Sequence, residues 1–126
     1  MKTIVSTPGA PSSPVYSQGT TAGPFLYVSG MTGTDVSTGQ LAGTAIQTQT
    51  AQALRNCLAI VEAGGGTLAD IVQVTVLLTR PEDFAGMNEA YAEFFPSPPP
   101  ARAVTKLGVD LPNVLVSIMM TAYIAG

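Results

Sequence analysis

One amphipathic helix most constrains how this chain folds. Within residues 44–63, apolar side chains recur at spacings of three and four residues, at Ile46, Ala53, Leu54, Cys57, Leu58 and Val61. This periodicity predicts a helix with one apolar face. Thr44 is a suitable N-cap residue, and the glycines at 64–66 follow where the helix should end. A helix of this kind buries its apolar face against a second layer.

The second layer is predicted to be a β-sheet. Runs rich in β-branched and aromatic side chains predict extended segments at residues 3–5, 15–19, 25–29, 71–79, 101–107 and 115–124. The segments at 15–19 and 25–29 are expected to pair as a hairpin. Residues 33–43 are expected to form a loop. A second helix is expected from Pro81 to Phe95, with acidic residues in its first turn.

The order β-β-β-α-β-α-β-β predicts an α+β fold. It implies one mixed β-sheet with two helices packed on one face, in a single domain that spans residues 1–126. Charged residues make up only 10% of the chain. A monomer with so little charge would expose apolar surface, and such surface usually marks an interface. We therefore expect a homo-oligomer.

Composition excludes several classes of function. The chain has no histidine and a single cysteine, Cys57, so a Ser–His or Cys–His nucleophile pair is excluded and no metal site is expected. Its five basic residues are scattered, and the net charge is −3, which argues against a nucleic-acid partner. No apolar segment reaches the roughly 20 residues of a membrane helix. The lone cysteine and the absence of a signal-like N-terminus suit a cytoplasmic protein.

Arg102 is the first candidate for a functional residue. It follows three prolines, Pro98–Pro100, and lies in an apolar segment that is predicted to be a strand. Burying a guanidinium group without a partner is costly, so this side chain should meet an anion or reach solvent. The planar fork of donors on arginine fits a carboxylate. A small carboxylic acid is therefore the first ligand to consider.

Four segments together resemble the RidA/YjgF family of enamine/imine deaminases. In chain order they are Val15–Gly19, Tyr27–Gly30, Asp83–Tyr91 with Phe94 and Phe95, and Pro100–Ala103. No single one of them is decisive. Their order and the predicted elements between them extend the resemblance over nearly the whole chain.

This resemblance implies a chorismate-mutase-like fold that assembles as a homotrimer with ligand pockets between subunits. It also implies hydrolysis of reactive enamines and imines, such as 2-aminoacrylate, to 2-keto acids and ammonia without a cofactor or metal. By position in the motifs, Arg102 would bind the substrate carboxylate. Tyr16 would act with Arg102 as a catalytic residue and, with Ser29 and Gly30, would line the pocket. Asn88 is expected to contact the substrate and to brace the loop that carries the arginine.

Two positions depart from the pattern of the active members. Val104 stands where these members commonly have a cysteine, and Met120 stands where a glutamate on the last strand is thought to orient water or relay a proton. Both side chains are expected to line the pocket, which would then be drier. Three functions stay open: an imine deaminase, a trimeric module that binds small carboxylates without turnover, and an enzyme remade for a bulkier, more apolar substrate.

Overall fold

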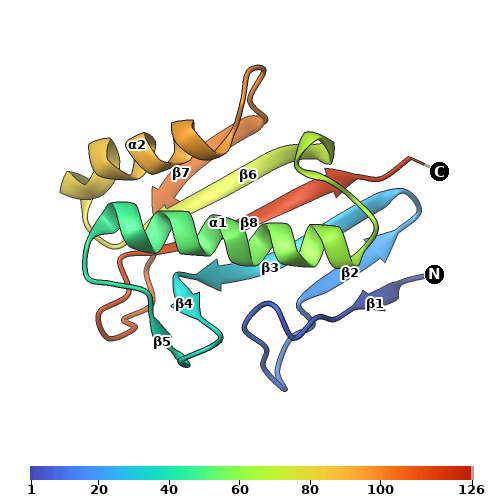
Figure 1. Cartoon of the computed structure of the whole chain (residues 1–126), viewed down its shortest axis with the longest axis horizontal. Helices are drawn as coiled ribbons and strands as arrows, with labels where there is room; N and C mark the ends of the chain where they lie inside the picture. The colour runs from blue at the N-terminus through green and yellow to red at the C-terminus, as the bar shows by residue number, and fades with distance from the viewer. Residues whose placement is uncertain (126) are drawn as a thin grey trace.

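A six-stranded mixed sheet forms one layer of the protein (Figure 1). The computed structural model describes residues 1–125. The strands are β1 (Thr3–Val5), β2 (Gly19–Ala22), β3 (Phe25–Thr32), β6 (Ile71–Leu78), β7 (Ala101–Lys106) and β8 (Val116–Tyr123). They lie in the order β1-β2-β3-β8-β6-β7. Only β6 and β7 pair in parallel.

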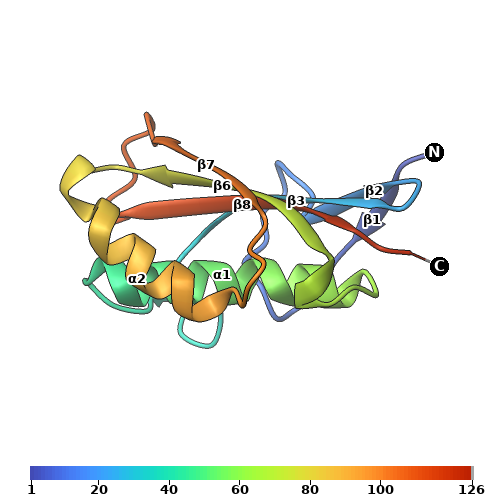
Figure 2. The same cartoon turned by 90° about the horizontal axis from the view of Figure 1, so that it is seen from above.

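Two helices form the second layer, and both cover the same face of the sheet (Figure 2). They are α1 (Ile46–Ala63) and α2 (Phe84–Phe94), and the two helices pack against each other. The α2 helix lies in the crossover that a parallel β6–β7 pair requires. Short 3₁₀ turns, η1 (Leu68–Asp70) and η2 (Pro81–Asp83), precede β6 and α2. The predicted α+β fold, with one mixed sheet and both helices on one face, is confirmed.

The core lies between these layers. The predicted apolar face of α1 supplies the buried residues Ala53, Leu54, Cys57 and Val61. Alternate residues of the central strands meet that face: Val74, Val76 and Leu78 from β6, and Val116, Ile118, Met120 and Ala122 from β8. The period of two along a strand sends the other residues of each strand to the opposite face.

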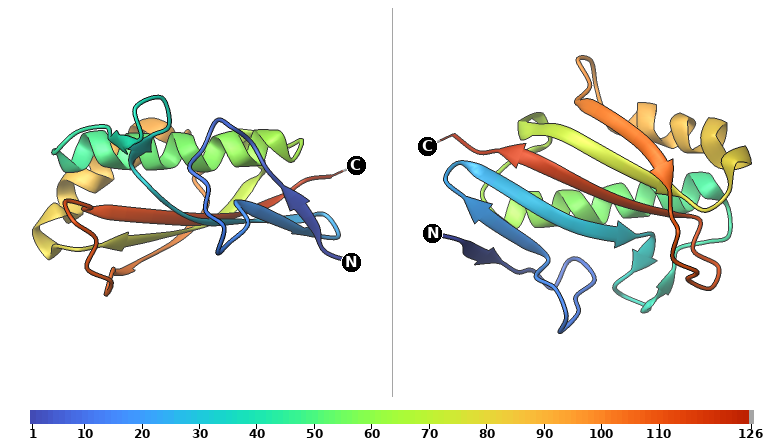
Figure 3. Two further views of the ribbon diagram at one scale, coloured as in Figure 1. Left: turned by 90° about the horizontal axis from the view of Figure 1, so that it is seen from below. Right: turned by 180° about the vertical axis from the view of Figure 1, so that it is seen from behind.

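That opposite face is open across the part of the chain that the structure describes (Figure 3, right). Exposed apolar side chains project from several of its strands: Ile4, Phe25, Tyr27, Val72, Met119 and Tyr123. This exposed apolar surface agrees with the expectation, drawn from the low charge of the chain, that a single subunit would expose apolar side chains. Within residues 1–125, no helix combines the length and apolarity needed to cross a membrane.

Three local predictions were wrong. The N-cap of α1 is Ala45 rather than Thr44, and no side chain caps the helix. Residues 33–43 hold two short paired strands, β4 (Thr34–Asp35) and β5 (Gln40–Leu41). The predicted strand at 15–19 begins only at its last residue, because the segment before it is a loop tied to the Gln18 side chain.

The Gln18 amide shows why this loop is stable without strand pairing. Its nitrogen donates to the carbonyls of Thr7, Ala10 and Pro11 at 2.9–3.0 Å, and its oxygen accepts from the Thr7 amide at 2.7 Å. One buried side chain thus supplies the backbone partners that a strand neighbour would otherwise provide. Tyr16 therefore lies in a loop.

Candidate functional site

Arg102 lies on β7, at one edge of the sheet, with its guanidinium group over α2. Its Nη1 donates to Asn88 Oδ1 at 2.6 Å. The guanidinium carbon lies 4.7 Å from the centre of the Tyr91 ring and 6.0 Å from that of Phe84. Phe84, Asn88 and Tyr91 share a helical face because they lie four and three residues apart. Asn88 is thus bonded directly to the Arg102 side chain.

No carboxylate of the described chain neutralises Arg102. The one ion pair within residues 1–125 joins Arg80 to Asp83, at 2.9 Å. Arg102 is exposed and lines a hollow of about 510 Å³. A second hollow, of about 450 Å³, lies beside it on the same side of the sheet, lined by Phe84 and Val104. A cation held by an amide and two aromatic rings, with donors to spare, is suited to binding an anion.

The larger of these two hollows is partly polar. It is about 510 Å³ in volume and is lined by residues of α2 and of the proline-rich loop, including Asn88, Tyr91, Ser97 and Arg102. The Tyr91 hydroxyl is buried without a hydrogen-bond partner in the described chain. Burial raises the pKa of Tyr91, and the nearby Arg102 charge lowers it by a smaller amount. The phenol therefore stays neutral at physiological pH.

Tyr16, Ser29 and Gly30 form a second group. Ser29 closes the Tyr16 loop onto β3: its Oγ donates to the Ser17 carbonyl at 2.6 Å, and its amide donates to the Gln18 carbonyl at 2.9 Å. Tyr16 is 42% exposed and lines a hollow of about 470 Å³. Ser29 and Gly30 lie where the β3–β8 register shifts, between Val28 and Met31.

The two groups do not meet within one chain. In the sheet order, β8 and β6 separate β3 from β7. At about 4.8 Å per strand, the two groups lie at least ~14 Å apart. The structure therefore brings Arg102 together with Asn88, and Tyr16 together with Ser29, but leaves the pairs on different parts of the sheet.

Met120 does not line a pocket, contrary to the expectation from the family resemblance. It is 2% exposed and belongs to the core beneath the helices, opposite Val28 and Val74 in register. The opposite face of β8 carries Ser117, which is 9% exposed, and Met119, which is 44% exposed. Met120 is therefore not a pocket-lining residue of the described chain.

Ser117 is the residue of β8 that lies beside the bulge. A Cβ atom added to Gly30 would approach Ser117 Oγ to 3.1 Å. Ser117 was not singled out in the sequence analysis. The alternation of buried Val116, Ile118 and Met120 could have found it, since residues between them must face the other way.

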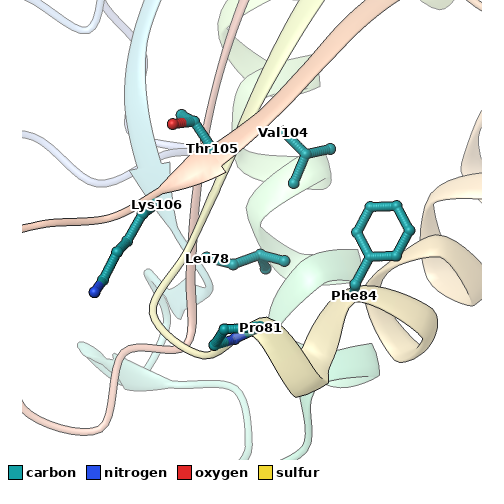
Figure 4. Close-up of a pocket in the computed structure, with 6 residues that line it drawn as sticks. All are labelled: Leu78, Pro81, Phe84, Val104, Thr105 and Lys106. Atoms are coloured by element: carbon teal, nitrogen blue, oxygen red, sulfur yellow. The ribbon is translucent and has the colours of Figure 1, made fainter.

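Val104 and Phe84 line the hollow of about 450 Å³ beside Arg102 (Figure 4). The only cysteine, Cys57, lies elsewhere, in the core, where its thiol donates to the Ile118 carbonyl at 3.3 Å. Burial raises the pKa of this thiol well above its usual range, so it has no nucleophilic role. Among residues 1–125, no three His, Cys, Asp or Glu side chains cluster as a metal site would require.

Comparisons with known proteins show which family the chain belongs to. The family model described as Endoribonuclease L-PSP matches residues 7–124. A RutC family protein of Pyrococcus horikoshii is 42% identical, over 98% of both chains. A 2-iminobutanoate/2-iminopropanoate deaminase of Dermatophagoides farinae is 37% identical, over 93% of this chain and 92% of its own.

A solved structure extends the agreement to the fold. RidA from the Antarctic bacterium Psychrobacter is 35% identical to this chain and superposes with a TM-score of 0.90, over 97% of this chain and 99% of its own. The sequence match and the shared fold cover the same, nearly complete length. The chain therefore belongs to the Endoribonuclease L-PSP family, which is the RidA/YjgF family that its motifs resemble.

Proposed function

We propose that the protein hydrolyses 2-imino acids to 2-keto acids and ammonia, with Arg102 as the anchor for the substrate carboxylate. The observation that carries this proposal is the guanidinium group itself. It is held at 2.6 Å by Asn88 and stacked on Tyr91, yet no carboxylate of its own chain pairs with it. Similarity to a relative named as a 2-iminobutanoate/2-iminopropanoate deaminase supports the reaction type.

The reaction requires little from acid–base groups. Water adds to the carbon of a protonated imine, the C–N bond then breaks, and the oxygen of water remains on the keto acid while ammonia leaves. A protonated imine is already electrophilic, so the main contribution of the protein is to position it. Neither Ser117 nor Met119 on the open face of β8 supplies a carboxylate. Backbone groups and the carboxylate of the substrate would therefore orient the water.

We further propose that a complete site needs two copies of the chain. Arg102 lies at one edge of the sheet, and Tyr16 and Ser29 lie about 14 Å or more away, toward the other edge. A closed homotrimer would place the β7 edge of one copy beside the Tyr16 loop of the next. The exposed apolar side chains of the open sheet face are consistent with such an assembly.

The direct test generates 2-iminobutanoate in solution and follows the release of 2-ketobutanoate. We expect release well above the buffer rate. Arg102→Ala should lower kcat/KM by about 10- to 100-fold, because a hydrogen bond to a charged group contributes roughly 1.5–3 kcal/mol. Arg55→Ala is the matched control, since Arg55 is an exposed arginine of α1 whose guanidinium group donates to Gln52 at 3.0 Å and lies outside the candidate site. Release at the buffer rate from correctly folded protein would refute the proposal.

A carboxylate-binding module without turnover is the second candidate. The lack of a carboxylate on the open face of β8 favours it, because no side chain there can act as a general base. In this case 2-ketobutanoate or benzoate should bind, and Arg102→Ala should abolish binding, while no imino acid is hydrolysed. Cleavage of RNA is not proposed, since the five scattered cations and the absence of histidine offer neither a phosphate groove nor an acid–base pair.

A further inference from the structure

An apolar hollow lies next to Arg102, on the helix side of β7 (Figure 4). It measures about 450 Å³, within the usual range of small-ligand sites. Its walls come from the end of β6, the start of α2 and the strand β7: Leu78, Pro81, Phe84, Val104, Thr105 and Lys106. Phe84 is 47% exposed, so a large apolar ring faces this space without cover.

The Phe84 ring lies between the hollow and Arg102. The Phe84 ring lines the hollow, and its centre lies 6.0 Å from the Arg102 guanidinium carbon. Val104 follows Arg102 by two residues on the same strand, so both side chains point to the same face, about 7 Å apart. A ligand whose carboxylate binds Arg102 can therefore extend a side chain past Phe84 into the hollow.

The character of the hollow selects an apolar side chain. Four of its six lining residues are apolar. Figure 4 shows the Lys106 amine directed away from Leu78, Pro81 and Phe84, so only the aliphatic part of this side chain borders the space. The hollow on the other side of Arg102 is more polar, with Asn88 and Ser97. It suits the carboxylate end of a ligand.

We infer that the preferred substrates are 2-imino acids with branched or aromatic apolar side chains, which fill the hollow between Phe84 and Val104. This inference rests on the proposed function and adds a substrate class to it. The methyl group of 2-iminopropanoate would leave most of this hollow unfilled. The reaction is the same hydrolysis, in which the C=N bond is replaced by C=O and ammonia leaves, with no change of oxidation state.

The test compares imino acids that an amino-acid oxidase makes from leucine, phenylalanine and alanine, using the whole 126-residue chain. We expect kcat/KM for the leucine- and phenylalanine-derived imines to exceed that for the alanine-derived imine by at least about tenfold, since each methylene in an apolar pocket contributes a factor of 10 or more. Val104→Thr adds a hydroxyl to the hollow at nearly constant volume, and it should reduce this ratio several-fold. Phe84→Ala, which removes the aromatic wall of the hollow, should also reduce the ratio of kcat/KM for the larger imines to that for the alanine-derived imine.

Val36→Thr is the matched control. It makes the same change at an exposed valine between β4 and β5, and the ratio should stay unchanged. An alanine-derived imine hydrolysed as fast as the larger ones would overturn the inference and leave the proposed function standing. A ratio that neither Val104→Thr nor Phe84→Ala changes would also overturn it. Hydrolysis of none of the three imines would overturn the proposed function, and the inference with it.

Discussion

Replacing Met120 with glutamate tests the assignment of β8 to its two faces. Met120 is 2% exposed and lies between Val28 of β3 and Val74 of β6, beneath the helices. The variant loses the burial of an apolar side chain, which contributes about 1.5–3 kcal/mol. It also places a carboxyl group among apolar neighbours with no cationic partner. Burial of this kind raises the pKa of a carboxyl group by up to 3–5 units.

The pH dependence follows from that raised pKa. The unfolded chain releases the proton above a pH of about 4.3, while the folded chain retains it to higher pH. The unfolded state therefore binds fewer protons, and stability falls as pH rises from about 4.3 to the folded pKa. At 1.36 kcal/mol per pH unit, the loss reaches about 4 kcal/mol at pH 7. Together with the lost burial, it approaches the whole stability of a typical domain, about 5–15 kcal/mol.

The assay is urea denaturation at fixed protein concentration, at pH 5 and pH 7, with wild type as the reference. Met120→Glu should lose about 3 kcal/mol more at pH 7 than at pH 5. Val36→Glu is the control at an exposed apolar site outside the six-stranded sheet, between β4 and β5, and it should cost no more than about 1 kcal/mol at either pH. Met120→Glu protein as stable as wild type at pH 7, with no dependence on pH, would refute the assignment of this strand.

Three further predictions concern other parts of the molecule. Gly33→Ala should destabilise the protein by about 1–3 kcal/mol in the same assay, because the new Cβ would lie 2.5 Å from the Gln49 carbonyl oxygen; Gly108→Ala, with nothing within 4 Å, should change stability by less than ~1 kcal/mol. The Cys57 thiol should not react with a disulfide reagent at pH 8 until the protein is denatured, because burial raises its pKa, and rapid labelling of the native protein would contradict that burial. Asn88→Asp should raise KM for an imino acid by about tenfold, because a carboxylate 2.6 Å from Arg102 Nη1 would compete with the substrate; an unchanged KM would argue against Arg102 as the anchor.

The fold could be predicted because its hydrophobic periodicity is strong and local. The apolar face of α1 and the alternation along β6 and β8 define the two layers, and the short connections limit how the strands can be ordered. The Tyr16 loop could not be predicted in the same way. Its residues favour an extended strand, but hydrogen bonds from the buried Gln18 side chain and from Ser29 to distant carbonyls hold them as a loop.

The candidate site was only partly predictable for a related reason. Arg102 and Asn88 lie near motifs with clear spacing, and a single hydrogen bond joins them. The position on β8 depends on strand register, where a slip of one residue exchanges the faces. Met120 was placed at the site by its position in the family motif, whereas its side chain is 2% exposed and points into the core.

Subunit complementation tests the central claim most directly. Arg102→Ala and Tyr16→Ala proteins, each with little activity in 2-iminobutanoate hydrolysis, are unfolded together in equal amounts and refolded as mixed oligomers. If each site takes Arg102 from one copy and Tyr16 from another, chance pairing restores about a quarter of the sites to the wild-type composition. The account predicts about a quarter of wild-type activity in the mixture. A mixture no more active than its two components would contradict it.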